Sequence, residues 1–142
     1  LGGSFSGHIF IRERWFGSDD ALYAAARLLE IFSSESQPVS RFFQDLPAST
    51  GTPEFSLPLK EGEAFEVMDK LKKNAAFDDA DVIDVDGLRA EFSDGWALVK
   101  ASNTMPALVF RFEAEDRTAL ERIKEMMRNR IQSVLRDVTI PF

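Results

Sequence analysis

The sequence predicts an α+β fold in which an antiparallel sheet carries its helices on one face. Three observations predict it. Short β-prone runs joined by Asp-Gly pairs fill the centre of the chain, and Asp-Gly is a strong two-residue hairpin signal. Apolar residues repeat with helical spacing before and after those runs. Within two of the runs the apolar residues alternate, as in a sheet that is covered on one side.

Residues 1–34 follow a different pattern, that of a loop, one strand and one helix. A glycine-rich opening runs into a strand at residues 9–12, and the run ends near Gly17. Asp20 and its neighbours can cap a helix that continues to about Phe32. One helical face is predicted to be buried: Leu22, Ala25, Ala26 and Leu29. Because one strand and one helix cannot enclose a core, we interpret this loop-strand-helix segment as the remnant of a preceding α/β domain.

The remaining chain divides into a linker at residues 35–52 and a C-terminal domain at residues 53–142. The linker contains a short helical piece at residues 39–46, and residues 47–53 are expected to be loop. In the C-terminal domain the expected element order is β-α-β-β-β-β-α. Its strands are predicted at residues 54–59, 81–85, 88–92, 96–100 and 107–113.

Two helices accompany these strands. The first is predicted at residues 62–75, with an inward face of Ala64, Phe65, Met68 and Leu71. The second begins after Asp116, with an apolar seam of Leu120, Ile123, Met127, Ile131 and Val134. Both helices are expected on one face of the antiparallel sheet.

Composition and charge exclude several classes of function. The net charge is −7, from 24 acidic and 17 basic residues, which argues against a general nucleic-acid binder. No apolar run reaches the roughly 18 residues that a membrane helix needs. The lack of cysteine excludes disulfides and thiol catalysis and fits a reducing, cytoplasmic compartment. With one histidine and no cysteine, a structural zinc site is not expected.

The most informative stretch is a polar loop between the last two predicted strands. Lys100 is followed by Ser102, Asn103 and Thr104, and Met-Pro closes the loop. Hydroxyls, an amide, backbone N–H groups and one ammonium can converge on a single oxyanion. The alternative is a polar hairpin tip whose side chains satisfy their own turn. Spacing alone leaves both interpretations open.

Two motifs carry a resemblance to a known family. The run DGLRAEFSDGWALVKASNTMPALVFRFEA resembles the C-terminal domain of bacterial phosphomannomutase/phosphoglucomutase, of the α-D-phosphohexomutase superfamily, whose phosphate loop reads R-A-S-N-T-x-P. The opening GGSFSGHIFIRERWFGSDDALYAAARLLEIF resembles the sugar-binding loop G-E-x-S-G-H and the strand and helix that close the third domain. The motifs occur in the family's order, so the resemblance covers essentially the whole chain.

The resemblance implies an isomerase of carbohydrate metabolism that works by phosphotransfer. In that family a phosphoserine of the first domain donates its phosphate to a hexose 1- or 6-phosphate, and the bisphosphate intermediate turns around in the cleft. An Asp-rich loop of the second domain holds Mg²⁺. This sequence has neither a T-x-S-H-N-P-like nor a D-G-D-G-D-R-like motif. We therefore expect a fragment that binds no metal, is inactive alone and works with the missing N-terminal domains.

Site residues follow from the same resemblance. Lys100, Ser102, Asn103 and Thr104 would hold the phosphate that is not transferred. Ser4 and Ser6 would contact sugar hydroxyls, and His8 would be a general acid or base. The alternative for His8 is a loop-anchoring side chain bonded to backbone. Arg111 remains an additional basic residue near the phosphate loop.

Two positions depart from the family pattern. Ser4 stands where the sugar loop has Glu, so a charged acceptor of two hydroxyl bonds becomes a short neutral group. Lys100 stands where the phosphate loop has Arg, which keeps the charge and loses the two-pronged grip. Two other functions stay open. One is a non-catalytic protein-interaction domain, and the other is a phosphoglucosamine mutase relative.

Overall fold

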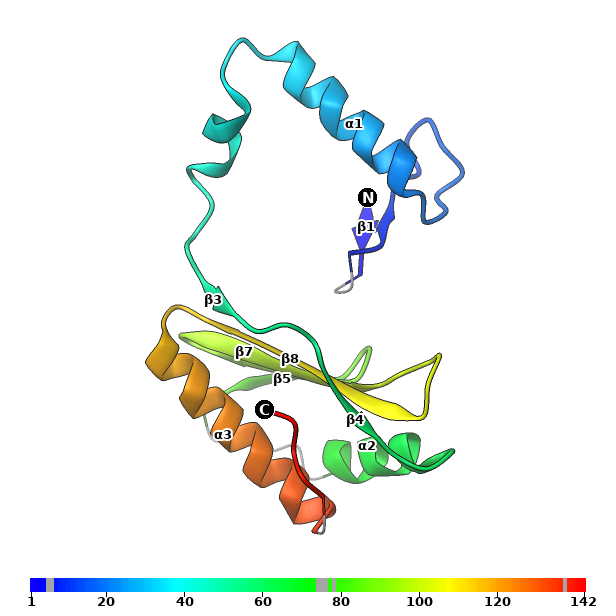
Figure 1. Cartoon of the computed structure of the whole chain (residues 1–142), viewed down its shortest axis with the longest axis vertical. Coiled ribbons are helices and arrows are strands. Elements are labelled where there is room, and N and C mark those ends of the chain that lie inside the picture. The colour runs from blue at the N-terminus through cyan, green and yellow to red at the C-terminus, as the bar shows by residue number, and fades with distance from the viewer. Residues whose placement is uncertain (5–6, 74–76, 78, 137) are drawn as a thin grey trace. The chain divides into compact units, whose positions relative to one another are not determined.

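The computed structural model describes residues 1–4, 7–73, 77, 79–136 and 138–142. Contacts divide the chain into an N-terminal unit, Leu1–Pro47, and a C-terminal unit, Ala48–Phe142 (Figure 1). No helix within the described ranges combines the length and apolarity that crossing a bilayer requires. Each unit is described by itself below.

The C-terminal unit is built on an antiparallel sheet. Its strands are β3 (Thr50–Gly51), β4 (Phe55–Pro58), β5 (Asp81–Ile83), β6 (Leu88–Phe92), β7 (Gly95–Ala101) and β8 (Ala107–Ala114). The spatial order is β3-β8-β7-β6-β5, and β4 also pairs with β8. The Asp-Gly turns lie between β5 and β6 and between β6 and β7, so consecutive strands pair as hairpins.

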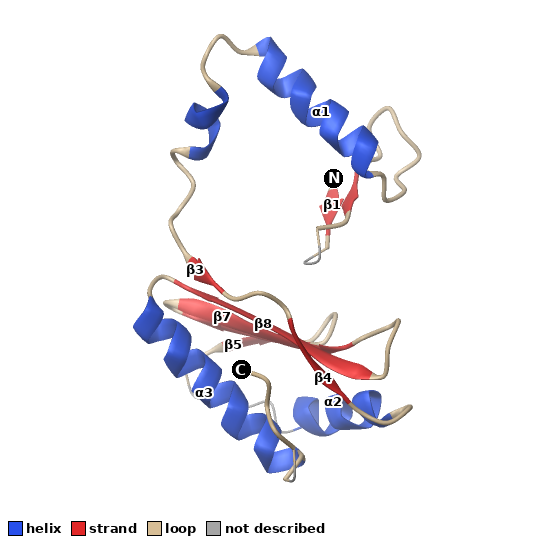
Figure 2. Ribbon diagram, in the orientation of Figure 1, coloured by secondary structure: helices blue, strands red, loops and turns tan. Residues whose placement is uncertain are grey.

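Two helices cover one face of this sheet (Figure 2). The first is α2 (Glu63–Lys73), and the second is α3 (Arg117–Val134), which packs across β7 and β8. The Asp116 carboxylate caps α3 by accepting a hydrogen bond of 2.8 Å from the Ala119 N–H. The chain then returns to the sheet, and the Phe142 ring lies 4.6 Å from the Phe112 ring. The core of the unit therefore lies between the helices and one sheet face.

The predicted fold class and element order are confirmed, with local differences. In α2 the face toward the sheet is Ala64, Val67, Met68 and Leu71. The prediction for Phe65 is wrong, because this side chain is 58% exposed and turned away from that face. The expected end of α2, at residues 74–75, lies outside the described residues. The linker prediction missed β3, which pairs Thr50 with Ala114.

The N-terminal unit has little regular structure. It contains a two-strand hairpin of β1 (Gly2–Gly3) and β2 (Ile9–Phe10), the helix α1 (Ala21–Ser34) and the 3-10 helix η1 (Val39–Phe43). The cap prediction is confirmed, since the Asp20 carboxylate accepts from the Tyr23 N–H at 2.9 Å. The predicted strand at residues 9–12 is shorter, and Arg14 soon adopts a left-handed backbone with φ 57°.

The predicted buried face of α1 is wrong for this chain. Leu22 is 85% exposed and Leu29 is 65% exposed, and α1 has no buried residue. Helical spacing marks a face that can be buried, but burial needs a second layer. The other described elements of this unit are two-residue strands and a short 3-10 helix, which are too small to supply that layer.

Charged groups instead hold α1 to the segment that precedes it. Arg27 lies 3.1 Å from the Glu13 carboxylate and 2.9 Å from Glu30. Arg14 also bonds Glu30 at 2.7 Å, and this hydrogen bond lowers the pKa of the Glu30 carboxyl. The Trp15 ring stacks on Tyr23 at 4.5 Å. Arg14 and Trp15 therefore have a structural explanation.

The two units should respond differently to large-to-small substitutions. Ile123 is fully buried between helix and sheet, so Ile123→Ala should lower the unfolding free energy by about 2–5 kcal/mol. Leu29→Ala, a truncation on the exposed face of α1, should change it by less than about 0.5 kcal/mol. Urea unfolding followed by Trp96 fluorescence in a Trp15→Phe background measures the first, and unfolding followed by Trp15 fluorescence in a Trp96→Phe background measures the second. Equal losses would contradict the described core.

Candidate functional site

The pairing of β7 with β8 sets the geometry of the polar loop. The last pair is Ala101 with Leu108, and the Ser102 N–H donates to the Ala107 carbonyl at 2.9 Å. Inside the loop the Ser102 hydroxyl oxygen accepts from the backbone N–H groups of Thr104 at 3.4 Å and Met105 at 3.3 Å. The loop is thus a closed turn that is held by its own serine, and the Asn103 side chain is exposed at its tip.

Lys100 is held beside this loop by a carboxylate that the sequence analysis had treated only as part of a turn. Its ammonium donates to Asp86 at 3.1 Å. The Lys100 side chain is 25% exposed and that of Asp86 is 76% exposed. The counter-ion of the ammonium is therefore solvated, and an anion from solution can compete with it.

Gly87 locks the Asp86 turn against Lys100. Its φ is +97°, a conformation that favours glycine. A Cβ at this position would lie 2.5 Å from both the Lys100 Cβ and the Val99 carbonyl oxygen. The turn between β5 and β6 can approach the end of β7 this closely only because residue 87 has no side chain.

Two small hollows flank the loop. One, of about 170 Å³, is lined by Glu61, Gly62, Ala64, Phe65, Ser102, Asn103, Thr104, Met105 and Pro106. The other, of about 180 Å³, is lined by Phe65, Met68, Asp69, Lys72, Asp86, Gly87, Lys100, Ala101 and Asn103. They share Phe65 and Asn103. The predicted site residues are thus divided: Ser102 and Thr104 lie on one side, Lys100 lies on the other, and Asn103 belongs to both.

The second hollow contains residues that the sequence analysis missed. Lys72 comes from α2, and Asp86 comes from the β5–β6 turn. The Asp-Gly motif marked the turn, but no spacing rule places it beside a lysine 14 positions later. Arg111 is paired with Leu98 in the β7–β8 ladder and does not line either hollow.

In the N-terminal unit the structure brings Ser4 and His8 together. The Ser4 hydroxyl lies 3.1 Å from His8 Nδ1 and accepts from the His8 backbone N–H at 3.2 Å. On the other side of the ring, Nε2 lies 3.7 Å from the Asp19 carboxylate. The imidazole is therefore oriented from both nitrogens. Ser6, the other predicted sugar contact, lies outside the described residues.

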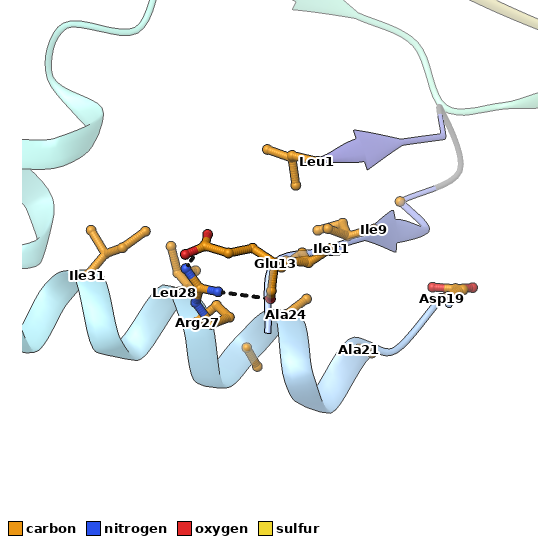
Figure 3. Close-up of a pocket in the computed structure, with 12 residues that line it drawn as sticks. Leu1, Ile9, Ile11, Glu13, Asp19, Ala21, Ala24, Arg27, Leu28 and Ile31 are labelled. Carbon is orange, nitrogen blue, oxygen red and sulfur yellow. Dashed lines mark hydrogen bonds and ion pairs between the residues drawn. The ribbon is translucent and has the colours of Figure 1, made fainter. Parts of the chain in front are cut away.

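A larger hollow of about 500 Å³ lies between α1 and the β1–β2 hairpin (Figure 3). Its lining is mostly aliphatic, with Ile9, Ile11, Leu28 and Ile31 among the residues drawn. The cation in its lining, Arg27, is paired with Glu13. This lining suits apolar groups better than a phosphate, so the candidate anion site remains the β7–β8 loop.

Family comparisons agree with this division of the chain. The family model described as "Phosphoglucomutase/phosphomannomutase, C-terminal domain" matches residues 56–130. The model described as "Phosphoglucomutase/phosphomannomutase, alpha/beta/alpha domain III" matches residues 1–50. The chain belongs to the phosphoglucomutase/phosphomannomutase family.

Individual relatives in this family are similar along nearly the whole chain. A phosphomannomutase/phosphoglucomutase of Pseudomonas aeruginosa is 42% identical over 142 residues, 100% of this chain and 31% of the relative. A phosphoglucomutase of Neisseria meningitidis is 50% identical over 135 residues, 94% of this chain and 29% of the relative. A crystal structure of a phosphoglucomutase/phosphomannomutase family protein from Burkholderia thailandensis superposes with a TM-score of 0.83 at 41% identity, covering 99% of this chain and 29% of that one. The chain thus spans about 30% of the length of these relatives.

Substitutions at two glycines of this phosphoglucomutase/phosphomannomutase family member test how closely the turn at Gly87 is held against Lys100. Gly62→Ala should cost only the left-handed backbone penalty, about 1–2 kcal/mol, because its φ is +78° and no described atom would lie within 4 Å of the new Cβ. Gly87→Ala should cost a further 1–3 kcal/mol or so, because the new Cβ overlaps Lys100 and Val99. Urea unfolding measures both. Equal costs would show that the turn can move away from Lys100.

The single histidine gives a direct test of the Ser4 contact. With Ser4 at Nδ1 and Asp19 at Nε2, the neutral His8 ring should carry its proton on Nε2. Ser4→Ala should reduce this preference, which ring ¹⁵N chemical shifts report. The matched control is Ser33→Ala in the same unit, whose hydroxyl donates to the Glu30 carbonyl. A tautomer ratio unchanged in Ser4→Ala would rule out orientation of the ring by this serine.

Proposed function

We propose that this chain is the substrate-positioning part of a phosphohexomutase. The whole enzyme would interconvert the 1-phosphate and the 6-phosphate of mannose or glucose through a bisphosphate intermediate. The observation that carries the proposal is the closed Ser102–Met105 turn with Lys100 beside it, in a chain of the phosphoglucomutase/phosphomannomutase family. The loop would hold the phosphate that is not being transferred.

The loop offers the chemistry that a phosphate needs. The Ser102 hydroxyl oxygen accepts inside the turn and lies 3.4 Å from the Thr104 hydroxyl. One hydroxyl hydrogen of the pair can bond the other oxygen, which leaves the second hydrogen as a donor to a ligand. Asn103 adds an exposed amide at the tip, and Lys100 adds a charge. Each charge-assisted hydrogen bond contributes about 1.5–3 kcal/mol. After the cost of association, a few such bonds give roughly millimolar to micromolar affinity.

A loop that recognises only phosphate fits a substrate that must bind in two orientations. The hexose bisphosphate presents first one end and then the other, and each distal phosphate must meet the same donors. A turn closed by its own backbone bonds holds those donors in one geometry. Positioning of this kind can lower a reaction barrier by several kcal/mol.

In the N-terminal unit we assign Ser4 and His8 to the sugar side, with Ser6 retained from the sequence motif. Asp19 and Ser4 orient the imidazole, as a proton-transferring ring requires. Because the Ser4 hydroxyl already bonds His8, it has less capacity for a sugar hydroxyl than the carboxylate found in the family motif. We therefore propose that Ser4 acts mainly by positioning His8.

The remaining chemistry belongs to parts of the enzyme outside this chain. Among the described residues, no group of three His, Cys, Asp or Glu side chains is arranged to hold a metal ion. The described residues thus do not fit the Mg²⁺ site that the family implies. We propose that the 142-residue chain is inactive alone, and that the whole enzyme is cytoplasmic, in keeping with the absence of cysteine from this chain.

A phosphate titration tests the proposed function. Inorganic phosphate, glucose 1-phosphate and mannose 1-phosphate should each shift the amide resonances of Ala101 and Asn103 at millimolar concentration. Lys100→Ala should weaken this binding about fivefold or more, because one charge-assisted hydrogen bond is lost. Lys70→Ala removes the same charge from the exposed surface of α2 and should leave binding unchanged. Loop amides that stay still while others move would contradict a phosphate role and favour a protein-docking surface.

A further inference from the structure

The β5–β6 turn holds two ammonium groups from two different elements. Lys100, at the end of β7, donates to the Asp86 carboxylate at 3.1 Å. Lys72, in the last turn of α2, donates to the Asp84 backbone carbonyl at 2.9 Å. These contacts attach both lysines to the same four-residue turn, which begins at Asp84 and ends at Gly87.

Both lysines also line the same hollow. This is the hollow of about 180 Å³ that Asn103 shares with the phosphate loop. Each ammonium has three N–H donors and uses one in the contact described above, so further donors remain for a ligand. The exposed Asn103 amide at the loop tip supplies another donor to the same space. This arrangement resembles an anion site more than a structural ion pair.

The hollow on the other side of the loop has the opposite character. It contains Ser102, Asn103 and Thr104, but its charged side chain is Glu61, which repels a phosphate. On electrostatic grounds an anion that contacts the loop is favoured on the side of Lys100 and Lys72. Asn103 can follow it there, because it lines both hollows.

We propose that Lys72 is a second phosphate-binding cation of this site, and that Asp86 is the internal competitor that an incoming phosphate displaces. The inference rests on the proposed function and deepens it. Asp86 and Asp69 balance the charges of Lys72 and Lys100 in the hollow. A phosphate group would replace the Asp86 carboxylate at the Lys100 ammonium and bond Lys72 from α2.

Displacing the Asp86 carboxylate from Lys100 costs little free energy, because that carboxylate is 76% exposed and remains hydrated when the ion pair breaks. A lysine at position 100 cannot make the bidentate hydrogen bonds that an arginine makes to phosphate. Lys72 would compensate for this, since two separate ammonium groups can bond two phosphate oxygens. The competition keeps phosphate binding weak. Weak binding suits a mutase whose intermediate must leave the loop and turn around.

Four variants of the 142-residue chain test this proposal. Inorganic phosphate is titrated at constant ionic strength, and the amide shifts of Ala101 and Asn103 give the dissociation constant. Lys72→Gln should weaken binding about two- to fivefold, the range for a partly exposed charge contact. Lys73→Gln, one residue further along α2 and outside the hollow, is the matched control and should change nothing. Lys72→Arg should restore binding, and Asp86→Asn should tighten it about two- to fivefold.

The outcomes separate this inference from the proposed function. If the unaltered chain shows no loop shifts, both are wrong. If it binds phosphate through Lys100 but Lys72→Gln matches Lys73→Gln, only the role of Lys72 is overturned. Weaker binding in Asp86→Asn would overturn the competitor role and would make Asp86 a support for Lys100. Tighter binding in that variant supports the proposal, because damage to the fold does not produce a gain in affinity.

Discussion

The pairing of β7 with β8 is the constraint on which the rest of the candidate site depends. Its register runs from Gly95 opposite Ala114 to Ala101 opposite Leu108, and it ends where the polar loop begins. The same strand β8 pairs with β3 and β4 on its other side and buries Phe110 and Phe112 against the helices. A shift of one residue would move Phe110 and Phe112 to the opposite face of the sheet, away from the helices. The position of the polar loop is therefore fixed by core packing.

The charge close to that loop differs from the net charge of the chain. The chain carries a net charge of −7, yet two ammonium groups from α2 and β7 meet at one turn beside the loop. The carboxylate of Asp86 partly neutralises the charge of Lys100. In the proposed function, an anion that binds here would exchange one negative partner of Lys100 for another, which favours reversible binding over tight binding.

The N-terminal unit does not depend on core packing in this way, because its described residues form no buried core. Its ion pairs and the Trp15–Tyr23 stack hold α1 to the preceding segment, while Leu22 and Leu29 stay exposed. Its chemically interesting feature is the ring of His8, which Ser4 and Asp19 orient from opposite sides. That arrangement depends on short-range contacts within the unit and not on a buried core.

The sequence by itself determined those features that depend only on residues close together along the chain. The Asp-Gly turns, the caps at Asp20 and Asp116 and the seam of α3 were all predictable, because each depends on residues within about one or two helical turns. Only the tertiary structure decided that Val67 is buried and Phe65 exposed, that Lys100 meets Asp86, and that Lys72 shares its hollow. Those facts depend on strand register and on how α2 lies against the sheet, which join residues that no local pattern connects. The exposure of Leu29 has the same origin, since an apolar stripe specifies a face but not the layer that covers it.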